Sequence, residues 1–151
     1  MVRGGLWETS VNLKHLGPID FSAVTMIAEA NGVMGLVAAG LEKSDVKAPQ
    51  SKVLNIVGGA LQIEQRNKAM NKFIADIVSK MRDECINLLL VKGQGVAQCY
   101  EKPLWRPSGD VDFLLSDENY KKAKDYLLPL STSNKNEERY SLHLGMSIGL
   151  W

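Results

Sequence analysis

The pattern of apolar and polar residues predicts helices over most of the first two-thirds of the chain. Apolar side chains recur every three or four positions between Asp20, a typical N-cap residue, and Gly32, which suits a left-handed helix stop. A shorter helix is expected over about residues 33–41. The polar stretch that follows, residues 42–51, predicts a linker, with Ser51 as the candidate cap of the next helix.

One helix is expected to be much longer than the others. From residue 52 to about residue 84, apolar residues keep a spacing of three or four, with Asn67 as the one polar member. At 1.5 Å per residue such a helix is roughly 50 Å long, and Gly58-Gly59 is the expected place for a bend. The opposite face is charged and should be solvated. Cys85, at helical spacing from this stripe, is expected to be a buried thiol.

The pattern changes after residue 86. The apolar run LLLV predicts a short buried strand that stops at Lys92-Gly93, and GQGVAQCY predicts a short helix. A turn between a strand and a helix exposes backbone amides that can hold a phosphate, but these residues are also typical of a plain turn. The stretch RPSGDVDFLL then predicts a second strand over residues 110–115.

The second strand begins with two aspartates. Because side chains alternate along a strand, Asp110 and Asp112 should point to one face, about 7 Å apart along the backbone, opposite Val111 and Phe113. Two carboxylates on one face can converge on hard cations, and a pair of bridged metal ions can activate an attacking oxygen. Gly109 would let the backbone approach a triphosphate. The competing interpretation is an acidic turn that leads into a hairpin.

The last part of the chain predicts a helix and then strand. Ser116 is the candidate cap of a helix with Tyr120, Ala123 and Leu127 inward and Leu130 as a further candidate. After a polar loop, apolar and polar residues alternate to the end, which predicts two short strands or one bent strand.

Composition narrows the class of protein. The 151 residues are 45% hydrophobic and 23% charged, which is typical of one soluble globular domain. A formal net charge of +1 gives no long-range field for a membrane or a long nucleic acid. We see no signal peptide or membrane span and expect a cytoplasmic protein. Two cysteines are too few for a metal knuckle or a disulfide framework.

The order of strand, Lys-Gly turn, short helix and Gly-Asp-x-Asp strand carries a resemblance. LLLVKGQGVAQCYEKPLWRPSGDVDFLL is similar to the core of an uncharacterised nucleotidyltransferase-like family of the DNA polymerase beta-like superfamily, and the resemblance covers roughly residues 17–130. It implies an α+β fold: an N-terminal helical part over residues 1–86 with one long helix, then a nucleotidyltransferase-type core over residues 87–151. The core would be a small mixed sheet flanked by helices. Both parts are expected to form one compact unit.

The resemblance also implies a chemistry. Asp110 and Asp112 would be the catalytic residues and would bind Mg²⁺, two ions in the intact family, to position a nucleoside triphosphate. An acceptor would attack the α-phosphate in line, and pyrophosphate would leave. For Lys92, Arg106 and Ser108 a structural role in the turns stays open beside a contact to phosphate. The candidate nucleotide-binding residues are Lys92, Gly93, Arg106, Ser108 and Gly109.

The chain departs from the superfamily pattern in two places. Gln94 follows Gly93 where a serine is usual. A third carboxylate should come from a later strand beside the aspartates, yet no Asp or Glu follows Glu138, so the chain resembles a C-terminally shortened member whose acidic strand would come next. Glu137 or Glu138 could substitute from the loop, and His143 is either a base near the site or a solvent-exposed histidine.

Three functions therefore remain in competition. The first is a Mg²⁺-dependent nucleotidyltransferase whose acceptor is unknown, with a small molecule or a protein favoured over a long nucleic acid. The second is a non-catalytic nucleotide-binding or protein-interaction module derived from that fold. The third is a helical scaffold in which Gly-Asp-Val-Asp is only a turn.

The apolar end of the chain predicts self-association. A terminal strand that ends in Leu150-Trp151 would leave an unpaired edge, and such edges pair with other copies. We expect a homo-oligomer in size-exclusion chromatography with light scattering. A monomeric mass at high protein concentration would contradict this expectation.

Overall fold

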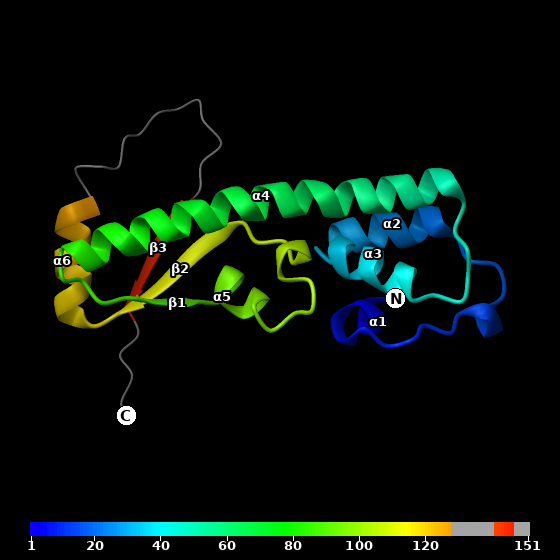
Figure 1. Ribbon diagram of the computed structural model, residues 1–151, viewed down its shortest axis with the longest axis horizontal. Coiled ribbons are helices and arrows are strands. Elements are labelled where there is room, and N and C mark those ends of the chain that lie inside the picture. The colour runs from blue at the N-terminus through cyan, green and yellow to red at the C-terminus, as the bar shows by residue number, and fades with distance from the viewer. Residues whose placement is uncertain (128–140, 147–151) are drawn as a thin grey trace. The chain divides into compact units, whose positions relative to one another are not determined.

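The computed structural model describes residues 1–127 with their side chains and the backbone of residues 141–146 (Figure 1). Leu130, the loop with Glu137 and Glu138, and the end at Leu150-Trp151 lie outside the described residues. The elements in chain order are α1 (Val2–Trp7), η1 (Lys14–Leu16), α2 (Phe21–Ala30), α3 (Met34–Glu42), α4 (Gln50–Asp83), β1 (Leu89–Val91), α5 (Gly93–Ala97), η2 (Pro103–Trp105), β2 (Asp110–Leu115), α6 (Asp117–Leu127) and β3 (Ser141–Met146).

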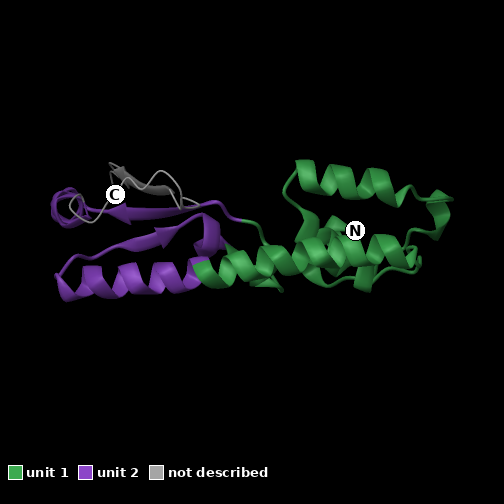
Figure 2. Cartoon of the chain, turned by 90° about the horizontal axis from the view of Figure 1, so that it is seen from above, with its two compact units in different colours: residues 1–69, 97–107 green, residues 70–96, 108–151 purple. Residues whose placement is uncertain are grey.

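These elements confirm the predicted α+β class, with helices first and a small mixed sheet after them. The chain forms two compact units, coloured separately in Figure 2. Unit 1 consists of residues 1–69 and 97–107, and unit 2 consists of residues 70–96 and 108–151. In the described part of the chain, no helix combines the length and apolar character that crossing a bilayer requires. That residues 1–86 and 87–151 form one compact whole stays a prediction.

The signals for the start and stop of α2 are confirmed. Asp20 Oδ1 accepts hydrogen bonds from the amides of Ser22 at 2.8 Å and Ala23 at 3.1 Å, which satisfies two of the free N–H groups of the first turn. After the helix, Gly32 adopts a φ of 61°, a conformation that favours glycine. The Asp20 cap therefore sets the start of α2, and the left-handed conformation of Gly32 follows its end.

The long helix is also confirmed, but its start is not where the sequence suggested. Helix α4 contains 34 residues and runs unbroken through Gly58-Gly59. It begins at Gln50, so Ser51 lies inside the helix and its prediction as a cap is wrong. Pro49 precedes the helix instead, and its carbonyl accepts from the amides of Lys52 at 2.9 Å and Val53 at 3.0 Å. Proline suits this place because it has no N–H to satisfy.

Asn67, the one polar member of the apolar stripe of α4, is hydrogen-bonded to a segment of unit 1 that is distant in sequence, residues 104–106. Its side chain is 1% exposed, and Nδ2 donates hydrogen bonds of 2.7 Å to the carbonyls of Leu104 and Arg106. A buried amide that bridges two main-chain carbonyls is costly to replace, because apolar substitutes would leave both acceptors unsatisfied. The polar interruption of the stripe is thus a structural contact.

A hydrogen bond from Trp105 also holds residues 104–106 against α4. The indole Nε1 of Trp105 donates to Glu64 Oε2 at 2.8 Å, and Lys68 Nζ lies 2.6 Å from Glu64 Oε1. The hydrogen bond from Lys68, and then that from Trp105, hold the pKa of the Glu64 carboxyl below its ordinary value. On the other side, a methyl group on Gly35 would collide with the Trp105 backbone. Glycine there allows α3 and η2 to pack closely.

In unit 2, β2 is the central strand of the sheet. It pairs antiparallel with β1, with Val91 opposite Asp112, and parallel with β3, with Asp112 opposite His143. Over residues 112–114 both hydrogen-bonding edges of β2 are therefore occupied by described strands. The predicted bounds of β2, residues 110–115, are confirmed.

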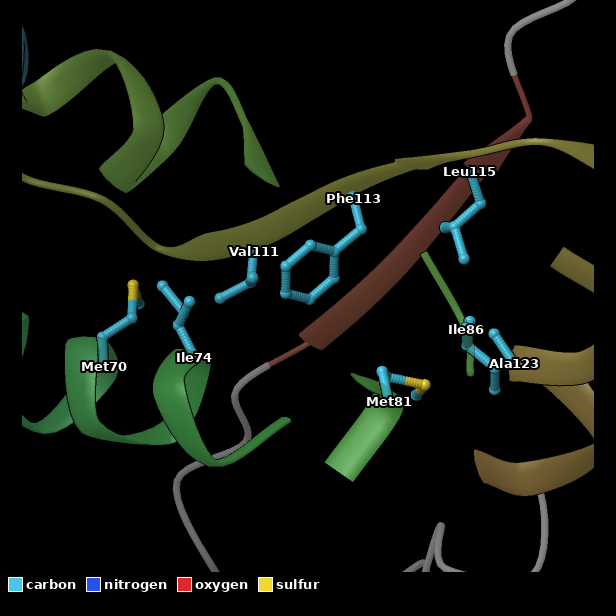
Figure 3. Packing of buried hydrophobic residues seen from close by; sticks show 8 residues of the cluster. All are labelled: Met70, Ile74, Met81, Ile86, Val111, Phe113, Leu115 and Ala123. Atoms are coloured by element: carbon cyan, nitrogen blue, oxygen red, sulfur yellow. The ribbon is translucent and has the colours of Figure 1, made fainter. Parts of the chain in front are cut away.

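The predicted alternation of β2 is confirmed as well. Val111 and Phe113 are each 2% exposed and Leu115 is 5% exposed. Figure 3 shows these side chains packed with residues of α4 and α6, and the cluster consists of Met70, Ile74, Met81, Ile86, Val111, Phe113, Leu115 and Ala123. Truncating a buried Phe such as Phe113 to Ala typically costs about 3–5 kcal/mol. This cluster is the core of unit 2.

Helix α6 begins as the sequence predicted. Ser116 Oγ accepts from the Asn119 amide at 3.4 Å, and Asn119 Oδ1 accepts in turn from the Asn87 amide at 3.0 Å. Ala123 is fully buried, and Tyr120 and Leu127 pack against the same core. Asn119, which is hydrogen-bonded to the capping serine, thereby also holds the segment that leads into β1.

Cys85 is exposed, so its prediction as a buried thiol is wrong. Helix α4 ends at Asp83, and Cys85 adopts a φ of 56°. The amide of Cys85 donates to Arg82 O at 3.0 Å and that of Ile86 to Met81 O at 2.8 Å. This pair of bonds is a Schellman motif, in which the residue after the left-handed one returns to the core. Ile86, 4% exposed, occupies the buried position.

We expect Cys85→Gly to stabilise the protein by about 1 kcal/mol, because glycine adopts the left-handed conformation without the steric cost of a Cβ. Urea unfolding under reducing conditions measures the change. Cys99→Gly is the matched control: Cys99 is also exposed but has no positive φ, so its replacement should be neutral or destabilising. Equal effects of the two substitutions would contradict the assignment of strain to Cys85.

Candidate functional site

The two aspartates stand on the outward face of β2. Asp110 is exposed and the side chain of Asp112 is 18% exposed. The register places Leu89 of β1 opposite Leu114 on this same face, and Leu89 is 61% exposed. The core lies on the opposite face, behind Phe113 and its neighbours. The predicted shared face of the carboxylates is thus present, with Asp110 exposed and Asp112 partly buried.

The Lys92-Gly93 turn lies next to the aspartates because β1 ends beside them. Val91 is opposite Asp112, and Lys92 Nζ lies 3.8 Å from Asp112 Oδ2. The Lys92 side chain is 76% exposed, and an ion pair this exposed contributes little to stability. Lys92 also has a φ of 52°, uncommon for a residue with a side chain. Strained backbone of this kind is often found at functional sites.

Gly93 is required by its surroundings. Its φ is 29°, and a methyl group there would lie 2.8 Å from Ser108 Oγ and 3.2 Å from the carbonyl oxygen of Asp110. Ser108 Oγ itself donates a long hydrogen bond of 3.3 Å to that carbonyl. The Lys-Gly turn therefore packs directly on the backbone that begins the Gly-Asp-Val-Asp strand. Ser108 has a structural contact, and its contact to phosphate stays a prediction.

Gly109 has no such requirement. A methyl group there would meet no atom within 4 Å, and its φ lies outside the left-handed region. Neither packing nor backbone conformation within the described residues calls for glycine at this position. The open space agrees with the predicted approach of a nucleotide to the backbone, which stays a prediction.

Gln94, which stands where the superfamily has a serine, belongs to the interior. It is 3% exposed, and Nε2 lies 3.8 Å from the sulfur of Met70. Its side chain is directed at α4. Gln94 therefore packs in the interior of unit 2.

Arg106 differs from the other candidates because it belongs to unit 1. Its carbonyl accepts from Asn67, its guanidinium carbon lies 5.8 Å from the centre of the Tyr100 ring, and Nη1 donates a long bond of 3.4 Å to Pro107 O. These contacts are structural and lie within unit 1. A contact between Arg106 and a nucleotide stays a prediction.

The donor set fits a magnesium ion in part. Mg²⁺ is usually held by one or two carboxylates together with water and substrate phosphates, and Asp110 with Asp112 meets that requirement. Among the residues whose side chains are described, no group of three from His, Cys, Asp and Glu is placed to hold a metal ion. That the two aspartates hold such an ion stays a prediction.

The strand beside the aspartates is β3, within this chain. Strand β3 pairs with β2 on the edge opposite β1. An acidic strand further along the chain stays a prediction. At the two positions in register with Asp110 and Asp112, β3 carries Ser141 and His143. No carboxylate occupies either position.

A cavity elsewhere in the molecule does not include these residues. It has a volume of about 450 Å³ and is lined by residues between Met1 and Leu13 of unit 1. We do not assign the chemistry to it, because none of the predicted site residues contributes to its lining. The aspartate site is an open face of the sheet.

The sheet brings the Lys-Gly turn beside the aspartate pair. The model of a family described as uncharacterised nucleotidyltransferases matches residues 17–145 of the chain. The chain belongs to this family. In the same comparisons no curated protein and no solved structure matches it.

The contrast between the two glycines can be measured. Gly93→Ala should destabilise the protein by roughly 1–2 kcal/mol, because a positive φ is sterically unfavourable for alanine and its Cβ would crowd the Asp110 carbonyl. Gly109→Ala should leave stability within about 0.5 kcal/mol of the unmodified chain, as for other surface changes. Chemical denaturation compares the two variants. A Gly109→Ala variant that is as unstable as Gly93→Ala would contradict the open space at residue 109.

Proposed function

We propose that the protein is a Mg²⁺-dependent nucleotidyltransferase that transfers a nucleoside monophosphate from a nucleoside triphosphate to an acceptor. The observation that supports this most is the pair Asp110 and Asp112 on the open face of a central strand, beside the Lys-Gly turn. Membership of the nucleotidyltransferase family supports the reaction class.

Each residue at the face has a proposed task. Asp110 and Asp112 hold the cation, and Mg²⁺ when bound neutralises phosphate charge and lowers the pKa of an attacking hydroxyl. Lys92 is exposed and only loosely paired with Asp112, so its ammonium group is free to contact the phosphates of the nucleotide. The bare backbone at Gly109 leaves room for those phosphates.

In the proposed reaction one bond to the α-phosphorus forms and another breaks. The acceptor hydroxyl loses its proton to solvent, and its oxygen forms a bond to the α-phosphorus. The bond from that phosphorus to the bridging oxygen of the β-phosphate breaks, and pyrophosphate leaves with the electron pair. A net charge of +1 does not favour many phosphate contacts, so we propose a small molecule or a protein as acceptor.

One observation favours a second function. Ser141 and His143, rather than carboxylates, stand in register with the aspartates, so the described residues supply fewer anionic ligands than a three-carboxylate site has. Fewer anions lower the affinity for a second cation and weaken the activation of the acceptor oxygen. The alternative is therefore a module that binds a nucleotide or a protein without turnover.

Calorimetric titration with each nucleoside triphosphate tests the site. We expect binding that requires Mg²⁺ and is lost in the Asp110→Asn/Asp112→Asn variant, because the nucleotide needs the cation that these carboxylates hold. The matched control is Asp76→Asn/Asp125→Asn, which makes the same charge change at two exposed positions on helices of unit 2. Absence of binding to every nucleotide tested, or an equal loss of binding in the control variant, would contradict the proposal.

Release of pyrophosphate separates the enzyme from the module. With Mg²⁺, a nucleotide that binds and fractions of candidate acceptors, the enzyme should release pyrophosphate, and either Asp110→Ala or Asp112→Ala should abolish the release. A module should bind the nucleotide through Mg²⁺ and release none. A coupled pyrophosphate assay reports the difference directly.

A further inference from the structure

The outward face of the β1–β2 pair changes from charged to apolar along the strands. Beside the Lys-Gly turn this face carries Asp110 and Asp112. Further from the turn it carries Leu89 and Leu114, which are register partners in the antiparallel pair. Partners of this kind project from the same face of a sheet, with their Cβ atoms about 5 Å apart. The two leucines therefore stand side by side, next to Asp112 on its face.

The apolar end of this face is exposed, although the strands have a core on their other side. Leu89 is 61% exposed and Leu114 is partly buried, whereas Leu90 and Phe113 belong to the core face. Beyond Leu114, the register partner on β3 is Gly145, which has no side chain to add. Single exposed leucines are common on protein surfaces. This one continues the face of the candidate site, so it has a specific neighbour to serve.

The spacing between the carboxylates and the leucines suits the two ends of a nucleotide. Leu114 follows Asp112 by two residues, which is about 7 Å along a strand. In a nucleoside triphosphate the ribose separates the α-phosphate from the base by a comparable distance. With the outer phosphates at Lys92 and the α-phosphate at the aspartates, the base would reach the leucines. A base has flat faces without hydrogen-bonding groups, and apolar side chains commonly line the sites of such rings.

We propose that Leu89 and Leu114 form the contact surface for the base of the nucleoside triphosphate whose phosphates are bound at the aspartates. This inference deepens the proposed function and rests on one part of it, the Mg²⁺-dependent binding of a nucleotide at Asp110 and Asp112. It does not depend on turnover, so it holds both for a transferase and for a module that only binds the nucleotide.

Calorimetric titrations with Mg²⁺ test the proposal, using the four common ribonucleoside triphosphates and inorganic triphosphate as probes. The probes share their phosphates, so only a nucleotide should gain from the leucines. Leu89→Ser should weaken the tightest-binding nucleotide roughly 5–20-fold, because its base loses an apolar contact, and should leave the affinity for inorganic triphosphate unchanged. The matched control is Leu54→Ser: Leu54 is 65% exposed, lies on α4 in unit 1 and should affect neither probe.

A conservative variant separates contact with the base from folding. Leu89→Met keeps an apolar side chain and should retain most of the nucleotide affinity, and both variants should unfold at the same urea concentration as the unmodified chain. Equal nucleotide affinity in Leu89→Ser and the unmodified chain, or an equal weakening of inorganic triphosphate, would overturn the inference. If nucleotide binding depends on the aspartates but not on Leu89, this inference fails while the proposed function stands. If neither a nucleotide nor inorganic triphosphate binds with Mg²⁺, both fail.

Discussion

Burial of one face of β2 is the constraint on which the site depends. The buried face of β2 packs against α4 and α6 in the core of unit 2. Its side chains are Val111, Phe113 and Leu115. Because the side-chain period of a strand is two, a shift of one residue would put both aspartates into that core. Burying two unpaired carboxylates is far more costly than leaving them in water. Apolar packing thus holds Asp110 and Asp112 on the open face.

Some unusual residues in the turns around β2 are explained by packing or helix termination, and others are not. Gly93 and Cys85 both have positive φ, and both have a structural explanation: Gly93 packs on the Asp110 backbone, and Cys85 ends a helix so that Ile86 can be buried. Lys92 and Gly109 lack such an explanation within the described contacts. Lys92 has a strained backbone and a loose ion pair, and Gly109 stands in open space. Residues of this second kind are the better candidates for contact with a ligand.

The Arg-Pro-Ser-Gly-Asp stretch is read as one motif along the chain, yet its parts belong to different units. Arg106 and Pro107 belong to unit 1, where the Arg106 carbonyl is held by Asn67. Ser108, Gly109 and Asp110 belong to unit 2. A polar residue in an apolar helical stripe was the signal for this attachment, since a buried amide needs partners. The sequence carried that signal, but not the identity of the two carbonyls that Asn67 would find.

Features that depend on local period and local chemistry could be predicted from the sequence. The strand at residues 110–115, the cap at Asp20, the long helix and the shared face of the aspartates all follow from spacing and from residue types next to one another. Spacing alone did not predict the exposure of Cys85, the start of α4 at Gln50 after Pro49, or the burial of Gln94. Each depended on which of several neighbouring residues occupies a buried or capping position. Only the tertiary structure decided that Lys92 lies beside Asp112 and that His143 is in register with it. These residues are far apart in the chain, and strand pairing, which a single strand's own pattern does not encode, brings them together.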